Sequence, residues 1–194
     1  NQCWCWDLSY IRTDLPRIFW YLYVMLDEWS RKEIAWLISP SLEHEYAKEL
    51  IDDAYITEGL LDVPRDQLPV VVNDRGSQMK QKDVTKMMRD LGLTQTFSRP
   101  RTPNDNPFIE SLFSTVKTAP EYPGWFPSSS IKYVKEYFEK YFAWYNNEHF
   151  HSGIDYLHPI DKHKGRAEKI LKYRKDCLNK QRVQRNLYWS GKIK

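Results

Sequence analysis

The sequence predicts an α/β fold, a five-stranded mixed sheet with helices on both faces. Three segments rich in β-branched and aromatic residues precede Pro40 and are close enough together to form an antiparallel meander. Helical and strand patterns then alternate, which is typical of strands in one sheet with helices packed against it. Val70–Val72 is a short apolar run without polar alternation, as expected for a strand buried on both faces.

The meander consists of three predicted strands. They cover Cys3–Ile11, Ile18–Leu26 and Glu33–Ser39, where aromatic and aliphatic residues dominate. Polar turns separate them at Thr13–Arg17, which contains a proline, and at Asp27–Arg31.

The alternating part begins with a helix predicted over Leu42–Thr57, whose apolar residues recur at the helical period. Gly59 follows it as a C-terminal cap. The fourth strand, Val70–Val72, leads to a helix over Lys82–Leu91 and to a fifth strand over Leu93–Phe97.

A further helix is predicted to begin after Asn106, a favourable N-cap residue, with Pro107 at its first position. Its buried stripe is formed by Ile109, Leu112, Phe113 and Val116. Glu110, Ser114 and Lys117 share another face of the same helix.

The remaining chain is predicted to be helical at both ends. An amphipathic helix covers Ser129–Asn146, and a polar connection, Asn147–Pro159, leads to a basic helix or extended arm over Arg166–Gln184. We therefore expect one body over residues 1–160 and a basic, helical extension over residues 161–194. His149, His151, His158 and His163 cluster in this region, where packing and hydrogen bonding are a simpler explanation than a metal site.

Charge is distributed unevenly between these two parts. Lys162–Lys194 holds 12 of the 29 basic residues and 2 of the 26 acidic ones, so it carries +10 and the preceding residues carry −7. A basic extension on an acidic body indicates a polyanionic partner. The extension could lie on target DNA, dock on a partner subunit, or be an ordinary solvated helix.

Cysteine use and hydropathy indicate a cytoplasmic protein. Three cysteines are too few for a disulfide framework and fit a reducing compartment. The longest apolar run, Ile18–Leu26, is too short to span a bilayer, and no signal peptide is visible. Because the chain begins at Asn1 without Met, we expect that an upstream part is missing.

Carboxylates are the candidate catalytic groups. Asp7 lies in the first predicted strand, and Asp74 follows the fourth at a turn containing Gly76. If these strands are neighbours, Asp7 and Asp74 come side by side, where ligand sites of open α/β sheets form. On its own, Asp74 could equally cap an ordinary turn.

Two carboxylates about 4 Å apart repel by roughly 4 kcal/mol at an effective dielectric near 20, so they share protons or bind cations. Oxygen ligands favour Mg²⁺ or Mn²⁺. Two such ions about 4 Å apart can activate an attacking oxygen and stabilise a leaving one, which suits phosphodiester cleavage and joining.

Basic residues near these acids are candidate nucleic-acid contacts. Lys117 follows Glu110 by two turns on one helix face, where its ammonium could meet a phosphate. Arg75, Arg99 and Arg101 could line the same groove, with Asn106 at the helix start. Lys80, Lys82, Lys86 and Arg89 could extend it, although each alone is more simply a surface charge.

Five motifs follow one another in a specific order, and 35 residues separate Asp74 from Glu110. The motifs are Trp6-Asp7-x-x-Tyr10-Ile11, Asp27-x-x-Ser30-Arg31, Asn73-Asp74-Arg75-Gly76-Ser77-Gln78, Asp105-Asn106-x-x-x-Glu110-Ser111-x-Phe113-Ser114-x-x-Lys117 and Tyr145-Asn146-Asn147-x-x-x-His151-Ser152. Over Trp4–Pro159 the chain resembles the D,D-35-E catalytic core of bacterial insertion-sequence transposases of the retroviral integrase type.

The resemblance implies a ribonuclease H-like fold in which Asp7, Asp74 and Glu110 form the catalytic, metal-binding triad. It also implies two Mg²⁺ or Mn²⁺ ions, contact between Lys117 and transposon-end DNA, and at least a homodimer on DNA. The implied activity is cleavage of DNA ends followed by attack of the freed 3′-OH on target DNA. The alternatives are a metal-dependent nuclease without strand transfer and a non-catalytic DNA-binding remnant of a mobile element.

Overall fold

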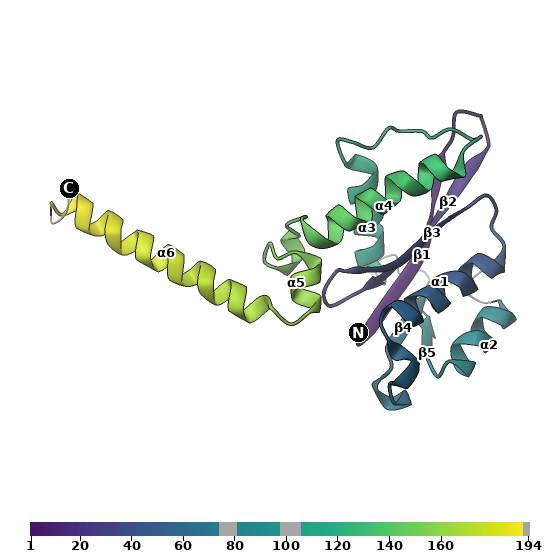
Figure 1. The fold of residues 1–194 in the computed structure, drawn as a ribbon, viewed down its shortest axis with the longest axis horizontal. Helices are drawn as coiled ribbons and strands as arrows, with labels where there is room; N and C mark the ends of the chain where they lie inside the picture. Colours follow the sequence, from purple (N-terminus) through teal and green to yellow (C-terminus); the bar gives the residue numbers. More distant parts are fainter. Residues whose placement is uncertain (74–80, 98–105, 192–194) are drawn as a thin grey trace.

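The five-stranded mixed sheet is confirmed in a computed structural model of the chain, which describes residues 1–73, 81–97 and 106–191. The strand order is β3-β2-β1-β4-β5 (Figure 1). The strands are β1 Cys3–Arg12, β2 Phe19–Asp27, β3 Glu33–Ser39, β4 Val70–Asn73 and β5 Thr94–Phe97.

The sheet combines an antiparallel half and a parallel half. β1 pairs antiparallel with β2, where Asp7 lies opposite Val24, and β2 pairs antiparallel with β3. β4 lies parallel to both β1 and β5, with Cys5 opposite Val72. The predicted neighbourhood of the first and fourth strands is therefore confirmed.

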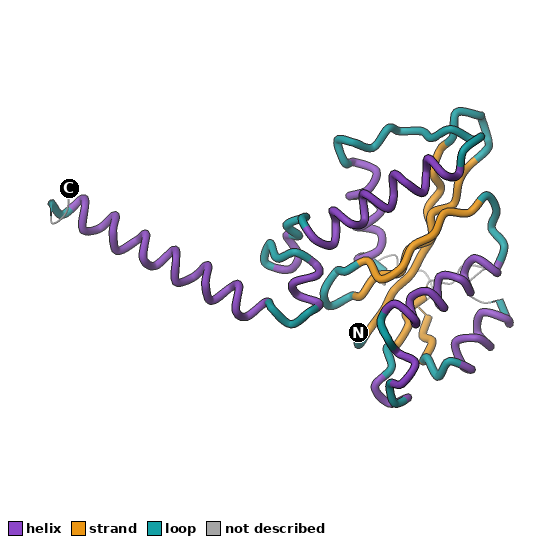
Figure 2. The backbone as a smooth tube through the Cα atoms, in the orientation of Figure 1, coloured by secondary structure: helices purple, strands orange, loops and turns teal. Residues whose placement is uncertain are grey.

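Helices cover both faces of the sheet, as predicted. In Figure 2, α1 and α2 lie on one side and α3 and α4 on the other. The helices are α1 His44–Thr57, α2 Lys82–Asp90, α3 Pro107–Thr118, α4 Ile131–Asn147, α5 Pro159–His163 and α6 Ala167–Trp189, with short 3₁₀ turns at Leu60–Asp62, Arg65–Gln67 and Ser152–Ile154.

Alternation along β1 creates two hydrophobic cores. Trp4 and Trp6 are fully buried in the core shared with α1 and α2. Cys5 and Ile11 are fully buried in the core shared with α3 and α4. Because strand residues alternate between faces, Asp7 belongs to the face of Cys5 and Ile11.

Local sequence signals account for the end of α1 and the start of α4. Gly59 adopts a left-handed conformation (φ 66°) directly after α1, the conformation that glycine adopts without steric cost. Ser130 caps α4 by accepting a hydrogen bond from the Tyr133 backbone N–H at 3.3 Å. The basic helix extends to Trp189, five residues beyond the predicted end at Gln184, because no helix-breaking residue intervenes.

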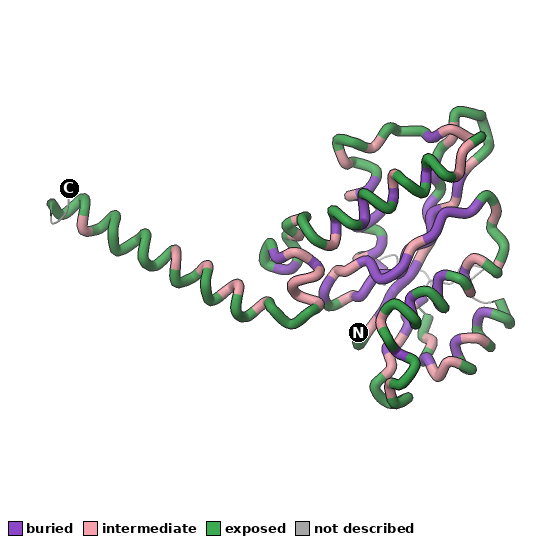
Figure 3. The backbone as a smooth tube through the Cα atoms, in the orientation of Figure 1, coloured by how far each residue is buried: buried purple, intermediate pink, exposed green. Residues whose placement is uncertain are grey.

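The predicted boundary between residues 160 and 161 falls inside α5. His163 of α5 contacts Glu58 through Nε2 at 2.8 Å and Ser30 through Nδ1 at 3.1 Å. These contacts attach α5 to the sheet body, so the extension begins after His163. All of α6 is described, and none of its residues is buried (Figure 3).

Within the described residues, no helix has both the length and the apolar character needed to cross a bilayer.

Candidate active site

Asp7 occupies the middle of β1, opposite Val24 of β2 and two residues beyond Cys5, the last β1 residue that pairs with β4. Its carboxylate is half-buried, and its Oδ1 accepts a hydrogen bond from the Leu8 backbone N–H at 2.7 Å. Pairing with β2 fixes the backbone at this position. Asp7 is thus an oriented anion on the sheet face that α3 covers.

Glu110 is presented by the first turn of α3. The predicted stripe of that helix is buried against the core that includes Cys5, which turns the exposed Glu110 away from the core. A carboxylate in the first turn interacts favourably with the positive end of the helix dipole. The structure therefore brings Asp7 and the helix carrying Glu110 to the same side of the sheet.

Asp74 lies outside the described residues, as do Arg75, Arg99 and Arg101. The described part of the chain reaches Asn73, the buried last residue of β4. Among described residues, no group of three or more His, Cys, Asp or Glu side chains could hold a metal ion. The two described members of the predicted triad, Asp7 and Glu110, both offer carboxylate oxygens, the donors that Mg²⁺ and Mn²⁺ prefer.

Lys117 lies on the exposed side of α3, near the end of β1. Partial burial lowers the pKa of its ammonium, and the nearby Arg12 guanidinium lowers it further. Arg12 and Lys117 thus place two cationic groups close enough to interact near this end of β1. Sequence patterns did not single out Arg12, because its proximity to α3 depends on how the helix lies across the sheet.

Asn106 occupies the predicted N-cap position of α3, but its side chain makes no capping hydrogen bond. The residue is only 6% exposed, and neither side-chain polar atom has a hydrogen-bond partner within the described residues. A contact with nucleic acid would require this side chain to become accessible.

Arg31 supports the start of α3 in a way that sequence patterns did not reveal. Its guanidinium carbon lies 3.4 Å from the centroid of the Phe108 ring, two residues before Glu110. Arg31 itself adopts a left-handed backbone conformation (φ 63°) in the turn after β2. This contact ties the turn to the first turn of α3.

His149 and His151 pack against neighbouring residues, and among the described residues they are not part of a group that could hold a metal ion. Burial lowers the pKa of His151 to about 4, with smaller contributions from His149 and Arg31. The His149 ring stacks on Tyr145 with centroids 5.3 Å apart. The predicted packing role of His151 agrees with its hydrogen bond from the Gly153 backbone N–H at 3.0 Å.

Two family matches cover most of the sheet body. Residues 1–103 match one family described as integrase core domain, and residues 91–159 match a second family of the same description.

Curated relatives are bacterial transposases. The chain is 29% identical over 161 residues to the transposase for insertion sequence element IS904 of Lactococcus lactis, covering 83% of this chain and 60% of that protein. It is 32% identical over 117 residues to transposase InsF for insertion sequence IS3A of Escherichia coli, covering 60% and 38% of the two proteins. The chain thus spans about 40 to 60% of the length of these relatives.

Solved structures share the fold at low sequence identity. The catalytic domain of the Mos1 mariner transposase superposes with a TM-score of 0.57 at 17% identity, over 73% of this chain and 70% of that one. The HTLV-2 integrase catalytic core domain gives a TM-score of 0.55 at 12% identity, over 78% and 90%. These neighbours establish the ribonuclease H-like fold. Because the first match alone covers 103 of 194 residues, the chain belongs to the integrase core domain family.

Proposed function

We propose that this chain is the catalytic core of an insertion-sequence transposase of the DDE type. Its reaction would be cleavage of DNA at transposon ends, followed by attack of the freed 3′-OH on target DNA. The observation that carries the proposal is that Asp7, fixed in β1, and the helix carrying Glu110 lie on one face of the sheet. The names of the curated relatives support the same activity.

Asp7, Asp74 and Glu110 are the proposed metal ligands. The HTLV-2 integrase core is described as a complex with magnesium, which supports dependence on a divalent cation. Two bound ions would lower the barrier for attack on a phosphodiester and stabilise the leaving oxygen. The protein's part is to hold the carboxylates in place: strand pairing does so for Asp7, and the packed α3 does so for Glu110.

Basic side chains would position DNA against these carboxylates. Lys117 and Arg12 could neutralise phosphates along the exposed face of α3, while Arg75, Arg99, Arg101 and Asn106 remain proposed contacts. Because two element ends must be joined to one target, we propose at least two copies of the chain on DNA. The simian T-cell lymphotropic virus intasome, a neighbour with a TM-score of 0.56 at 15% identity, is compatible with such an assembly.

The experiment compares cleavage and joining of element-end DNA by the full-length transposase and by variants altered at the proposed ligands. Asp7→Asn and Glu110→Gln should each reduce Mg²⁺-dependent cleavage by about two orders of magnitude or more, because each removes one anionic oxygen from the site. Glu139→Gln, which changes an exposed residue of α4, is the matched control and should keep full activity.

Two measurements separate this activity from its alternatives. Joining of a pre-nicked end to target DNA is expected, and cleavage without any joined product would indicate a nuclease. Mn²⁺ titration should show binding that Asp7→Asn weakens, and absence of Mn²⁺ binding by the wild-type protein would contradict the metal site. Wild-type rates in Glu110→Gln would remove that residue from the triad.

A further inference from the structure

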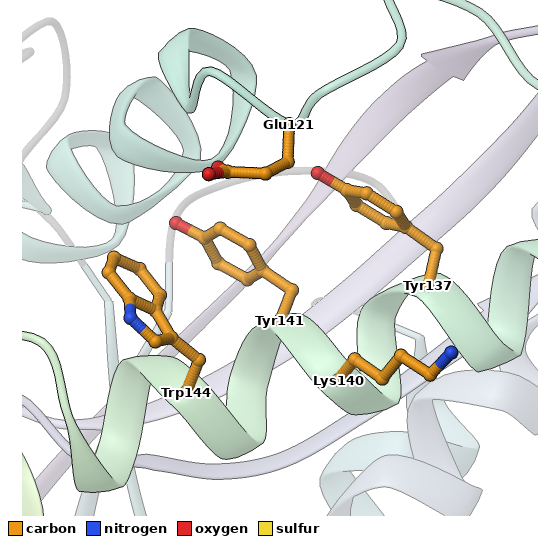
Figure 4. A pocket seen from close by; sticks show the side chains of 5 residues that line it. All are labelled: Glu121, Tyr137, Lys140, Tyr141 and Trp144. Atoms are coloured by element: carbon orange, nitrogen blue, oxygen red, sulfur yellow. The ribbon is translucent and has the colours of Figure 1, made fainter.

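A pocket of about 510 Å³ lies over the middle of α4, away from Asp7 and from the start of α3. Figure 4 shows that Tyr137, Lys140, Tyr141 and Trp144 come from α4, and that Glu121 approaches from the segment after α3. The phenol rings of Tyr137 and Tyr141 stack with centroids 6.4 Å apart, and Trp144 follows at 5.7 Å from Tyr141. Neither this wall of aromatic rings nor the carboxylate has a role in the proposed catalysis.

Two phenol hydroxyls of this pocket have no hydrogen-bond partner among the described residues, and the lining also holds one carboxylate, Glu121, and one ammonium, Lys140. Tyr141 is only 7% exposed, and no described residue forms a hydrogen bond with its hydroxyl or with that of Tyr137. Both hydroxyls are directed toward the side on which Glu121 lies (Figure 4). Burial raises the pKa of Tyr137 to about 12, with smaller contributions from Tyr122 and Glu121. Burial also raises the pKa of Tyr141, and Tyr137 and Glu121 raise it further.

Such a pocket fits a flat cation that donates several hydrogen bonds. A guanidinium group has five N–H donors in a plane and stacks on aromatic rings, so it can satisfy a carboxylate and two hydroxyls while lying against an indole. A compact ammonium matches this wide, flat arrangement less well.

Helix α6 carries such guanidinium groups, and its surface is left exposed by the body of its own chain. None of its residues is buried, and large apolar side chains remain exposed, including Leu178 at 68% and Trp189 at 82%. Leu178, Arg182, Arg185 and Trp189 are spaced at i, i+4, i+7 and i+11, so they share one face of the helix. That face combines arginines with flanking apolar groups.

Charge and geometry favour α6 of a second copy of the chain as the group that fills this pocket. The body up to residue 161 carries −7, whereas α6 alone has seven basic and two acidic residues, a net charge of +5. The helix leads away from its own body in Figures 1 and 2. Its base is fixed by His163 on Glu58 and by Arg174, which donates to the carbonyls of Asp155 and Tyr156 at 2.9 and 3.0 Å.

We propose that two copies of this chain exchange their α6 helices reciprocally, each inserting Arg185 into the pocket of Glu121, Tyr141 and Trp144 on its partner. The exchange would form a closed, two-fold dimer, since each copy supplies both the helix and the pocket. The contact forms in the absence of DNA and metal, so it is tested independently of the proposed catalytic activity.

The test measures the mass of the 194-residue chain in solution by light scattering or sedimentation, over a wide range of protein concentration. The wild-type chain should reach about twice its 23.4 kDa. Glu121→Arg and Arg185→Glu should each yield monomers, because like charges would then face one another. A mixture of the two variants should again form dimers, since each arginine then meets a glutamate across both contacts.

Matched controls come from the same helices. Glu139→Arg on α4 does not line the pocket, and Lys180→Glu lies on the opposite side of α6 from Arg185, so both should stay dimeric. Circular dichroism confirms that each variant is folded.

A wild-type chain that is monomeric at every concentration would overturn the proposal, as would dimers that persist in both single variants or a mixture that stays monomeric. If Arg185→Glu and Lys180→Glu leave the mass unchanged and weaken nonspecific DNA binding equally, α6 is a DNA-binding element and the proposal is wrong.

Discussion

At the scale of single residues, the buried Glu33 side chain has a raised pKa, which favours its protonated form. Asn146 of α4 brackets this first residue of β3: its Oδ1 accepts from the Glu33 backbone N–H at 2.9 Å, and its Nδ2 donates to the Glu33 carbonyl and carboxylate at 3.0 and 3.1 Å. Burial raises the pKa of Glu33 from 4.5 to about 8, against the opposing effect of Lys32. The neutral form is therefore the one that suits the folded chain.

This burial predicts a pH dependence of stability. Because the pKa of Glu33 is higher in the folded chain than in the unfolded chain, its contribution is complete below pH 4.5 and is lost as pH rises through about 8. The free energy of unfolding should fall by roughly 1 kcal/mol per pH unit in that interval. Glu33→Gln should flatten this slope, measured by urea unfolding at several pH values, whereas Glu139→Gln should leave it unchanged. An equal slope in wild type and Glu33→Gln would contradict the neutral assignment.

Residue-scale sequence patterns predicted correctly that Asp7 lies in a strand and Glu110 in a helix, because strand alternation and helical period decide which side chains share a face; their role as metal ligands stays a prediction. They could not predict partners that lie far apart in the chain. Glu33 and Asn146 are separated by 113 positions, and His163 and Glu58 by 105. The contact of Arg31 with Phe108 needs a left-handed turn at a non-glycine residue, which local composition does not specify.

At the scale of elements, the turn after β2 that contains Arg31 contacts the first turn of α3, the helix that carries Glu110. The guanidinium of Arg31 lies flat over Phe108, and burial lowers the pKa of the guanidinium without removing its charge. Arg31→Lys keeps the charge but loses the planar contact, and Phe108→Leu keeps the apolar volume but loses the ring.

A double-mutant cycle with these two changes should give a coupling of about 1 kcal/mol in the free energy of unfolding. The matched comparison is the more exposed pair of Lys162 and Trp29, whose ammonium-to-ring distance is 5.0 Å. Its cycle, with Lys162→Met and Trp29→Leu, should give a smaller coupling. Equal couplings for both pairs would show that the Arg31 contact has no special strength.

Element boundaries followed from the sequence wherever a single residue type decides them. Glycine ended α1, and Pro107 began α3, as expected. The capping role of Asn106 was wrong because its side chain is buried instead of turned onto the helix backbone. Burial of that kind depends on the surrounding tertiary structure.

At the scale of the whole molecule, the body and α6 should respond differently to truncation. None of the residues from 178 to 191, the described part of the chain after Cys177, is buried, so a chain ending at Cys177 should keep the wild-type unfolding midpoint at low protein concentration. A chain ending at Asp161 loses His163, whose pKa is raised by Asp27 and Glu58 despite the opposing effect of burial.

In the chain ending at Asp161, Glu58 loses its ion pair with His163 and keeps the one with Lys32. We expect the free energy of unfolding of this chain to fall by about 3 kcal/mol. Thermal and urea unfolding of both truncated chains would measure this difference. Equal loss in the two chains would mean that residues 162–177 contribute nothing to stability. The overall arrangement of sheet and helices could be predicted, whereas the attachment of α5 could not, because one histidine in a polar connection carries it.

Helix α6 has no glycine or proline between Ala167 and Trp189, and its base is anchored at two points. An uninterrupted helix of this length measures about 34 Å at 1.5 Å per residue. If the tip of α6 engages a second copy, as we propose, the length of α6 sets the separation between the two sheet bodies. Removing two turns would bring the two bodies closer by about 10 Å, and under the proposed function it would shorten the spacing between the two joining positions on target DNA.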